Sequence, residues 1–288
     1  MMNYIYVIIA ALLLPFDFSI SKKYQSVEGT SMAAGLKYNA LNGLFTALIF
    51  WGLTGFSVKF SGFSMIMAFS MALFCAAYSI IGFKILKAGS LGMYSLFLMS
   101  GGMLLPYLFG VTFLKESLTV FRIFGVILIL AAIVIANRTK QKVDKWQLIL
   151  CLVIFALNGM VGIVSKCHQI NVTYNTVDST MFVMYTGILR FFMSAATLAF
   201  VKEEKKVSFG YPKKVLPMIA ASAMISGLSY MLQLVGAKDL PASVLYPIVT
   251  GGSIVFSTIV GRVFFKEKPA VVQIAGTILC FVGTCMFL

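Results

Sequence analysis

One acidic residue, Asp17, lies inside the first long apolar stretch of the sequence, just after Pro15. A carboxylate is costly to place in an apolar helix, so such a residue indicates a functional site by default. Its chemistry would be proton coupling or neutralisation of a cationic substrate. A structural interpretation stays open beside it, because Asp17 could be hydrated near an interface or paired with Lys22 or Lys23.

Six further side chains carry polar groups within apolar stretches. A binding cavity needs a mostly apolar wall with a few convergent polar groups, and these residues would supply hydroxyls and amides. Each could equally make a hydrogen bond between two helices. The candidate cavity residues, together with Asp17, are Tyr78, Asn158, Tyr230, Gln233, Tyr246 and Thr250. Arg190, also in an apolar stretch, is expected to reach an interface or pair with another residue rather than bind substrate.

The other reactive residue types do not form the pattern of a catalytic or metal site. The chain has one histidine and nine acidic residues, and its five cysteines lack the paired spacing of a zinc site or a disulfide framework. An intramembrane enzyme would need a cluster of such residues at one depth. The phosphate-binding pattern GxxxxGK[ST] is also missing, which argues against ATP-driven transport by this chain alone. We expect no catalytic residue, cofactor or metal.

The composition is that of an integral membrane protein. Of 288 residues, 60% are hydrophobic and 11% are charged, which is more apolar surface than a soluble domain could bury. The net charge of +14 is spread between the apolar stretches, so it favours topology signals at a lipid surface over nucleic-acid binding. We expect a multi-pass protein of the cell membrane, whose partners are the bilayer and a small molecule.

The apolar stretches must form the helices that position these side chains, and they predict ten transmembrane helices in an all-α fold. The first is expected to be retained, because it lacks the basic start and small-residue cleavage site of a secretory signal. The expected spans are residues 3–24, 38–56, 63–86, 91–113, 119–136, 147–168, 180–201, 214–236, 243–265 and 270–288.

An internal repeat divides the chain into residues 1–137 and 146–288. A shift of 151 positions gives ten identities between residues 101 and 134 and the matching stretch, where roughly three or four are expected by chance. A shift of 144 aligns Ser21-Lys22 with Ser165-Lys166. Because each half holds an odd number of helices, the second must insert upside down, which predicts two inverted five-helix repeats enclosing a central cavity.

The repeat contains a charged motif twice, as FLKES and as FFKEK. Lys115, Glu116, Lys266 and Glu267 lie where one apolar helix ends and the next begins, which predicts structural hinges rather than substrate contacts. Ser117 could cap the following helix, Pro269 suits a first helical turn, and each glutamate would complement the dipole of the helix that follows it.

Small residues recur in the last helix of each half. Gly276 and Gly283 are spaced like Gly125 and Ala132, which predicts a close packing seam. A dimer interface is the alternative, so a monomer and a homodimer both stay open.

Together, the paired motifs, the spacing of Gly159 and Lys166, and the run from Tyr230 to Ser243 resemble the drug/metabolite transporter superfamily, in its EamA-like ten-helix branch. The resemblance extends over nearly the whole chain. It implies a secondary transporter that moves a small organic solute by alternating access, as an exporter of a metabolite, an amino acid or a drug-like compound.

The resemblance also implies which helices form the cavity, namely the first, third, fourth, sixth, eighth and ninth. The family usually has a small or amide residue where this chain has Asp17, so proton coupling does not follow from the resemblance. A membrane receptor or assembly subunit without transport is the alternative function, and an intramembrane enzyme is a further one.

The basic residues bear on orientation. Under the ten-span assignment, 17 of the 23 Lys and Arg residues fall in the odd-numbered connections. Because cytoplasmic connections carry the excess of positive charge, this predicts that both termini lie outside the cell. The resembling family is more often drawn with both termini in the cytoplasm, and the two expectations disagree.

Overall fold

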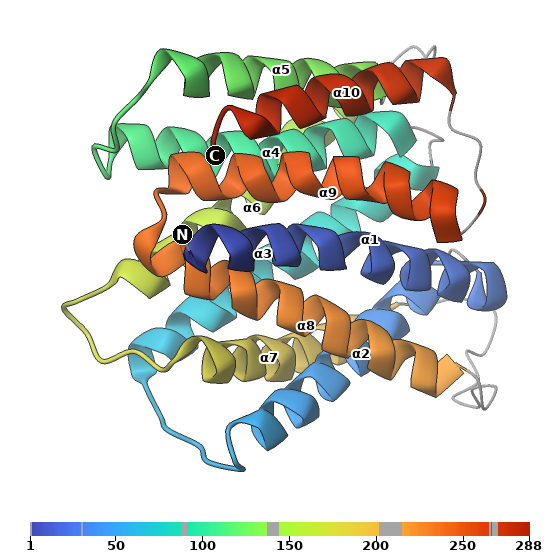
Figure 1. The fold of residues 1–288 in the computed structure, drawn as a ribbon. Helices are drawn as coiled ribbons and strands as arrows, with labels where there is room; N and C mark the ends of the chain where they lie inside the picture. Colours follow the sequence, from blue (N-terminus) through green and yellow to red (C-terminus); the bar gives the residue numbers. More distant parts are fainter. Residues whose placement is uncertain are drawn as a thin grey trace.

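The structure, a computed structural model, describes residues 2–29, 31–87, 91–136, 144–201, 215–264, 266 and 270–288. Within these residues it contains ten α-helices and no strand (Figure 1). The helices are α1 (Met2–Glu28), α2 (Met32–Leu53), α3 (Gly62–Lys87), α4 (Leu91–Thr112), α5 (Val120–Ala136), α6 (Lys145–Ile170), α7 (Ser179–Phe200), α8 (Val215–Asp239), α9 (Ala242–Phe264) and α10 (Val271–Cys285). The prediction of an all-α membrane protein is confirmed.

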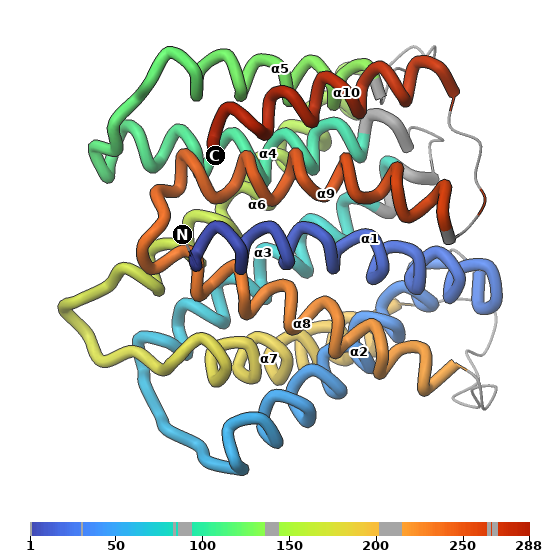
Figure 2. Tube along the Cα trace, viewed as in Figure 1, coloured from blue at the N-terminus to red at the C-terminus, as the bar shows by residue number. Residues whose placement is uncertain are grey.

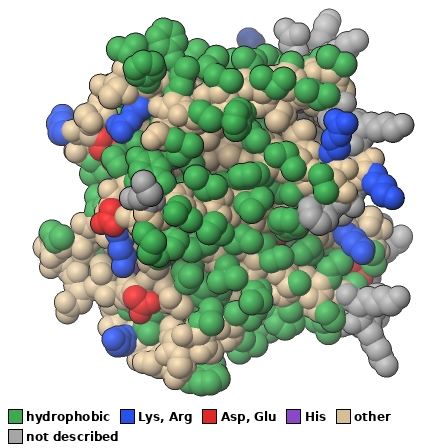
Figure 3. Space-filling model, viewed as in Figure 1, with side chains coloured by type: hydrophobic (Ala, Val, Ile, Leu, Met, Phe, Trp, Pro, Cys, Tyr) green, Lys and Arg blue, Asp and Glu red, His purple; other side chains and the backbone are tan. Residues whose placement is uncertain are grey.

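The surface agrees with a membrane environment. Hydrophobic side chains cover the middle of the face in Figure 3, and charged side chains gather at its two ends. Ile66 and Phe121, for example, are 65% and 72% exposed, which water would disfavour and lipid would not. Among the described residues, seven helices are long and apolar enough to span a bilayer, while α5 and α10 are shorter apolar helices of 17 and 15 residues.

Two helices differ from their predicted bounds, and the difference affects the charge count. The first helix continues to Glu28, and α2 begins at Met32 because Ser31 accepts a hydrogen bond from the backbone of Ala34 at 3.1 Å. Lys37, which was counted in the first connection, therefore lies buried within α2.

The apolar core is divided between two main clusters. One surrounds α9 and includes Leu245, Ile248 and, from α5, Ile129. The other surrounds the first half of α7 and includes Phe182 and, from α2, Phe50.

The main helix contacts occur in matching pairs when the two halves are exchanged. The contact of α1 with α8 corresponds to that of α6 with α3, and the contact of α1 with α9 corresponds to that of α6 with α4. The pairs α2 with α7, α4 with α9 and α5 with α10 correspond to themselves. The chain trace in Figure 2 shows α5 beside α10 at one edge of the bundle. The inverted arrangement stays a prediction, which these contacts support.

Close glycine contacts repeat the same correspondence at the level of residues. A Cβ on Gly101 would lie 2.2 Å from the carbonyl oxygen of Phe155, so α4 and α6 approach closely there. A Cβ on Gly252 would lie 3.0 Å from the Cβ of Ala11, which joins α9 to α1. The sequence shifts relate Gly101 to Gly252 and Ala11 to Phe155.

The predicted glycine seam joins two helices of the same chain. A Cβ on Gly283 of α10 would lie 2.9 Å from the carbonyl oxygen of Gly125 on α5, and the reverse distance is also 2.9 Å. Such an approach is typical of helix pairs packed in lipid. This contact supports the packing interpretation at Gly125 and Gly283.

Candidate functional site

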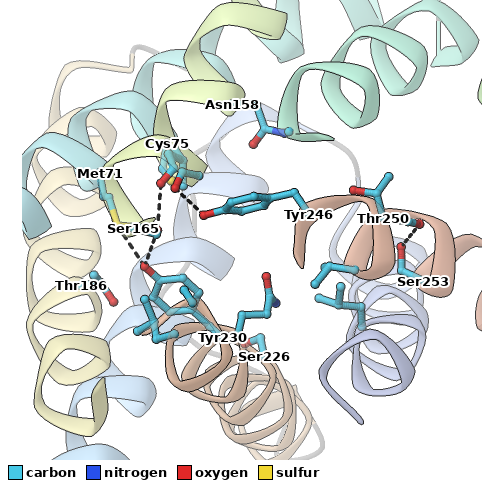
Figure 4. A pocket seen from close by; sticks show the side chains of 18 of the residues that line it. Met71, Cys75, Asn158, Ser165, Thr186, Ser226, Tyr230, Tyr246, Thr250 and Ser253 are labelled. Carbon is cyan, nitrogen blue, oxygen red and sulfur yellow. Dashed lines mark hydrogen bonds between the residues drawn. The ribbon is translucent and has the colours of Figure 1, made fainter. Parts of the chain in front are cut away.

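A cavity of about 440 Å³ lies among the helices of both halves (Figure 4). Residues of α1, α3, α4, α6, α8 and α9 line it, as the resemblance implied. The seventh helix, expected outside the cavity wall, also contributes to it through Val183, Thr186 and Arg190. These three side chains share one face of α7, since they are spaced three and four residues apart.

Six of the seven predicted cavity residues are brought together here. The residues that line the cavity are Tyr78, Asn158, Tyr230, Gln233, Tyr246 and Thr250. They come from α3, α6, α8 and α9, so helices distant in sequence bring them together. Their role in binding stays a prediction.

Two tyrosines connect the second half's last cavity helices to α6. The hydroxyl of Tyr230 lies 2.9 Å from the hydroxyl of Ser165 and 3.1 Å from the sulfur of Met71 (Figure 4). The hydroxyl of Tyr246 donates to the backbone carbonyl of Gly162. Their rings form part of the apolar wall, while their polar ends are satisfied by these contacts.

The two amides of the cavity behave differently. Asn158 donates to the backbone carbonyl of Leu98 at 2.7 Å, so it joins α6 to α4 while lining the cavity. Gln233 approaches the hydroxyl of Ser229, one turn earlier on α8, at 3.3 Å. The interhelical interpretation therefore holds for Asn158, and it does not exclude contact with a solute.

The seventh predicted residue, Asp17, is not part of the cavity wall. Its neighbour Phe18 lines the cavity, whereas the carboxylate accepts a hydrogen bond from Ser222 of α8. The expected alternatives of hydration or pairing with Lys22 or Lys23 did not anticipate this partner. The cause is geometric, because residues 17 and 18 project about 100° apart around a helix.

Four polar side chains extend from Asp17 back to the cavity. Ser222 lies 2.5 Å from the hydroxyl of Tyr38 and accepts from the amide of Asn42 at 3.2 Å. The side-chain oxygen of Asn42 accepts a hydrogen bond from the guanidinium of Arg190 at 3.1 Å. We name Asp17, Ser222, Tyr38, Asn42 and Arg190 the polar network. Sequence reasoning expected Arg190 to pair and missed its place in the cavity wall.

The hinge residues share an unusual backbone. Lys115 and Lys266 have φ of 55° and 54°, the left-handed region that few side chains adopt. The two lysines are related by the repeat, so the same backbone conformation occurs after the fourth helix of each half. Glu267 and Pro269 lie outside the described residues.

Glu116 stabilises a different helix from the one predicted. Its carboxylate accepts from the backbone N–H groups of Ala242 at 2.7 Å and Ser243 at 2.8 Å, at the start of α9. The following helix, α5, is capped by Thr119, the residue before its first turn. The hydroxyl of Thr119 accepts a hydrogen bond from the backbone N–H of Arg122 at 3.3 Å. Glu116 was predicted to complement the dipole of α5. It lies instead at the N-terminus of α9, because the turn after α4 brings its side chain back toward that helix.

Lys166 binds the end of α8, just before the start of α9 that Glu116 binds. Its ammonium donates to the carbonyls of Ala237 and Leu240, both at 2.7 Å, where α8 ends. An anion at the start of α9 and a cation at the end of α8 both complement exposed backbone groups. We name residues 237–243, held by these two side chains, the α8–α9 corner.

The single histidine is engaged in packing. Its ring nitrogens lie 2.8 Å from the hydroxyl of Ser64 and 3.0 Å from the amide of Gln169, and the ring stacks on Phe182. In the described part of the chain, no three His, Cys, Asp or Glu side chains come together as metal ligands would. His168 therefore acts as a buried contact between α6, α3 and α7.

Comparison with known proteins addresses the family and the fold. The model of the EamA-like transporter family matches residues 145–288, the second half of the chain. No curated protein matches. A solved structure, described only as a crystal structure of a protein, is similar with a TM-score of 0.74 at 13% identity, over 99% of this chain and 94% of the other. At that identity the likeness establishes a shared fold and nothing about substrate.

Proposed function

Because the chain belongs to the EamA-like transporter family, we propose that it is a secondary transporter that exports a small organic solute by alternating access. The candidate solutes are metabolites, amino acids and drug-like compounds. The proposed location is the cell membrane.

The cavity between the two halves is the observation that carries this proposal. Its volume of about 440 Å³ suits a small organic molecule, and its wall is mostly apolar with a few polar groups. The polar groups come from both halves, through Tyr78 in the first and Asn158 and Tyr246 in the second. A movement of one half against the other would therefore change the cavity directly.

Alternating access is supported by the paired helix contacts. Because the main helix contacts of one half have counterparts in the other, the halves can exchange conformations without a new fold. A receptor or assembly subunit would bind a ligand in the same cavity without releasing it on the other side. Flux therefore separates the two functions.

The test loads liposomes that contain the purified protein with a mixed extract of cellular metabolites. Mass spectrometry of the outer medium then identifies solutes that leave faster than from protein-free liposomes. Thr250→Trp fills the cavity wall and should abolish that flux. Ile259→Trp, on the same helix but 49% exposed, is the matched control and should keep it. Equal leakage with and without protein would reject the transporter.

A further inference from the structure

We propose that Arg190 binds the carboxylate of the transported solute, and that Asp17 balances its charge while the cavity is empty. This inference rests on the proposed function and names the class of substrate, a small monocarboxylate with an apolar body. It is carried by the polar network and by the place of Arg190 in the cavity wall.

The position of Arg190 is costly unless it serves a purpose. It lies eleven residues after the start of α7 and ten before its end, near the middle of an apolar span. A cation at such a depth is expensive and marks a substrate or ion path by default. Thr186, one turn earlier on the same face, lines the cavity with it.

The hydrogen bonds of the network all run in one direction. A serine hydroxyl has one hydrogen, and Ser222 donates it to Asp17. Ser222 must therefore accept from both Tyr38 and Asn42, which lie within 2.5 Å and 3.2 Å of its oxygen. Asn42 in turn accepts from Arg190. The guanidinium and the carboxylate are thus joined through two polarised neutral groups.

The hydrogen bonds that join Arg190 to Asp17 are shielded from water. Ser222 and Asn42 are 0% and 3% exposed, so no water competes for their hydrogen bonds. Electrostatic interactions are stronger where water is excluded. Arg190 and Asp17 together form a neutral unit in the empty cavity, with the cation at the wall and the anion behind it.

The guanidinium retains donors for a solute. Arginine has five N–H donors in a planar fork, and Asn42 takes one. No other hydrogen bond of this guanidinium is present within the described ranges. Carboxylates match the fork with two parallel hydrogen bonds, which lysine cannot offer. A single arginine in an apolar wall suits a monoanion better than a phosphate, whose second charge would stay unpaired.

The rest of the cavity suits an apolar body. Met71, Leu98 and Leu245 lie in the same wall as the polar groups. The solute would place its carboxylate at Arg190 and its hydrocarbon part toward these side chains. A neutral solute would bind poorly here, because it offers the guanidinium no carboxylate to accept its remaining hydrogen bonds.

The experiment compares carboxylates with their uncharged amides. Hexanoate, phenylacetate and indole-3-acetate are each titrated beside the corresponding amide, and affinity is measured from the ligand-dependent shift of thermal unfolding in detergent. Wild-type protein should bind at least one acid about tenfold more tightly than its amide. Arg190→Gln should lose that preference, whereas Arg262→Gln, at an exposed arginine of α9, should keep it.

Asp17→Asn keeps the inference testable if Arg190→Gln fails to fold. Removing the balancing carboxylate leaves Arg190 with an uncompensated charge, so carboxylate binding should become tighter. A merely destabilised protein would bind more weakly. No preference for the acid in any pair, an unchanged preference in Arg190→Gln, or weaker binding in Asp17→Asn would each overturn the proposal. So would tighter binding of phenyl phosphate than of phenylacetate.

The two proposals can fail separately. A protein that binds carboxylates but gives no flux in liposomes retains the arginine site and is not a transporter. A protein that carries only neutral or cationic solutes is a transporter without this site.

Discussion

Gly43 of α2 and Gly187 of α7 lie against each other where their helices cross. A Cβ on Gly43 would lie 2.8 Å from the carbonyl oxygen of Gly187, and a Cβ on Gly187 would lie 2.9 Å from that of Gly43. Their separation, 187 minus 43, is the repeat shift of 144 residues. The contact therefore corresponds to itself when the halves are exchanged.

Gly43→Val should destabilise the fold by about 1–3 kcal/mol, because backbone atoms have to move apart to admit the new side chain. Thermal unfolding in detergent measures the effect. Gly52→Val on the same helix is the control, since a Cβ at Gly52 would meet nothing within 4 Å. Equal losses in the two variants would contradict the close crossing.

Glu116→Gln should weaken the α8–α9 corner by about 1.5–3 kcal/mol, because two backbone N–H groups lose their charged acceptor. Unfolding temperature and protection of the Ala242 amide from hydrogen exchange report the change. Asp144→Asn removes a similar carboxylate from the exposed start of α6 and should cost less. A larger loss in Asp144→Asn would refute the special place of Glu116.

The left-handed backbone at Lys115 predicts opposite effects of two substitutions. Glycine adopts positive φ without penalty, so Lys115→Gly should preserve or raise the unfolding temperature. Lys115→Val should lower stability by about 1–2 kcal/mol, because a β-branched residue fits this region poorly. Both are measured by thermal unfolding, and a valine variant as stable as the glycine one would show that the turn is not strained.

Asp17→Asn should abolish transport driven by a pH gradient if Asp17 couples protons to the solute. The charged and titratable groups that share its network are Arg190 and Tyr38. Uptake into liposomes with and without a pH gradient checks this, and gel filtration checks folding. Asp144→Asn is the control, because Asp144 lies at the exposed start of α6 and has no bond to the polar network within the described residues. Retained pH dependence in Asp17→Asn would end the coupling hypothesis.

The orientation of the chain is a separate prediction. Both termini lie at the same end of the bundle (Figure 1). The charge count rests on basic residues assigned to the odd-numbered connections. Several of these, in residues 202–214 and 137–143, lie outside the described residues. A reporter active only in the cytoplasm, fused after Leu288, should stay silent if the charge rule holds. A strong signal there would favour the orientation usual in the family.

The sequence predicted the helices well, because each long apolar stretch carries its own hydrophobic signal. It also predicted six residues that line the cavity, because polar groups stand out within apolar spans, although their role in binding stays a prediction. It could not predict the cap of Glu116 on α9, because that contact depends on a turn that reverses the chain. It likewise missed the link from Asp17 to Arg190, which requires the relative rotation of four helices that no local pattern records.

Some contacts of the bundle lack a comparable counterpart in the other half, and the largest of these joins α6 to α8. The sixth helix packs against α8, with Lys166 and Ser165 bonded across the interface, whereas the corresponding α1 and α3 do not pack comparably in the described ranges. In a cycle where the halves exchange conformations, this asymmetry would distinguish one end state of the cycle from the other. Under the proposed alternating-access cycle, this contact would close the path between α6 and α8 at the end that holds the termini, and the exchanged state would open it and bring α1 against α3.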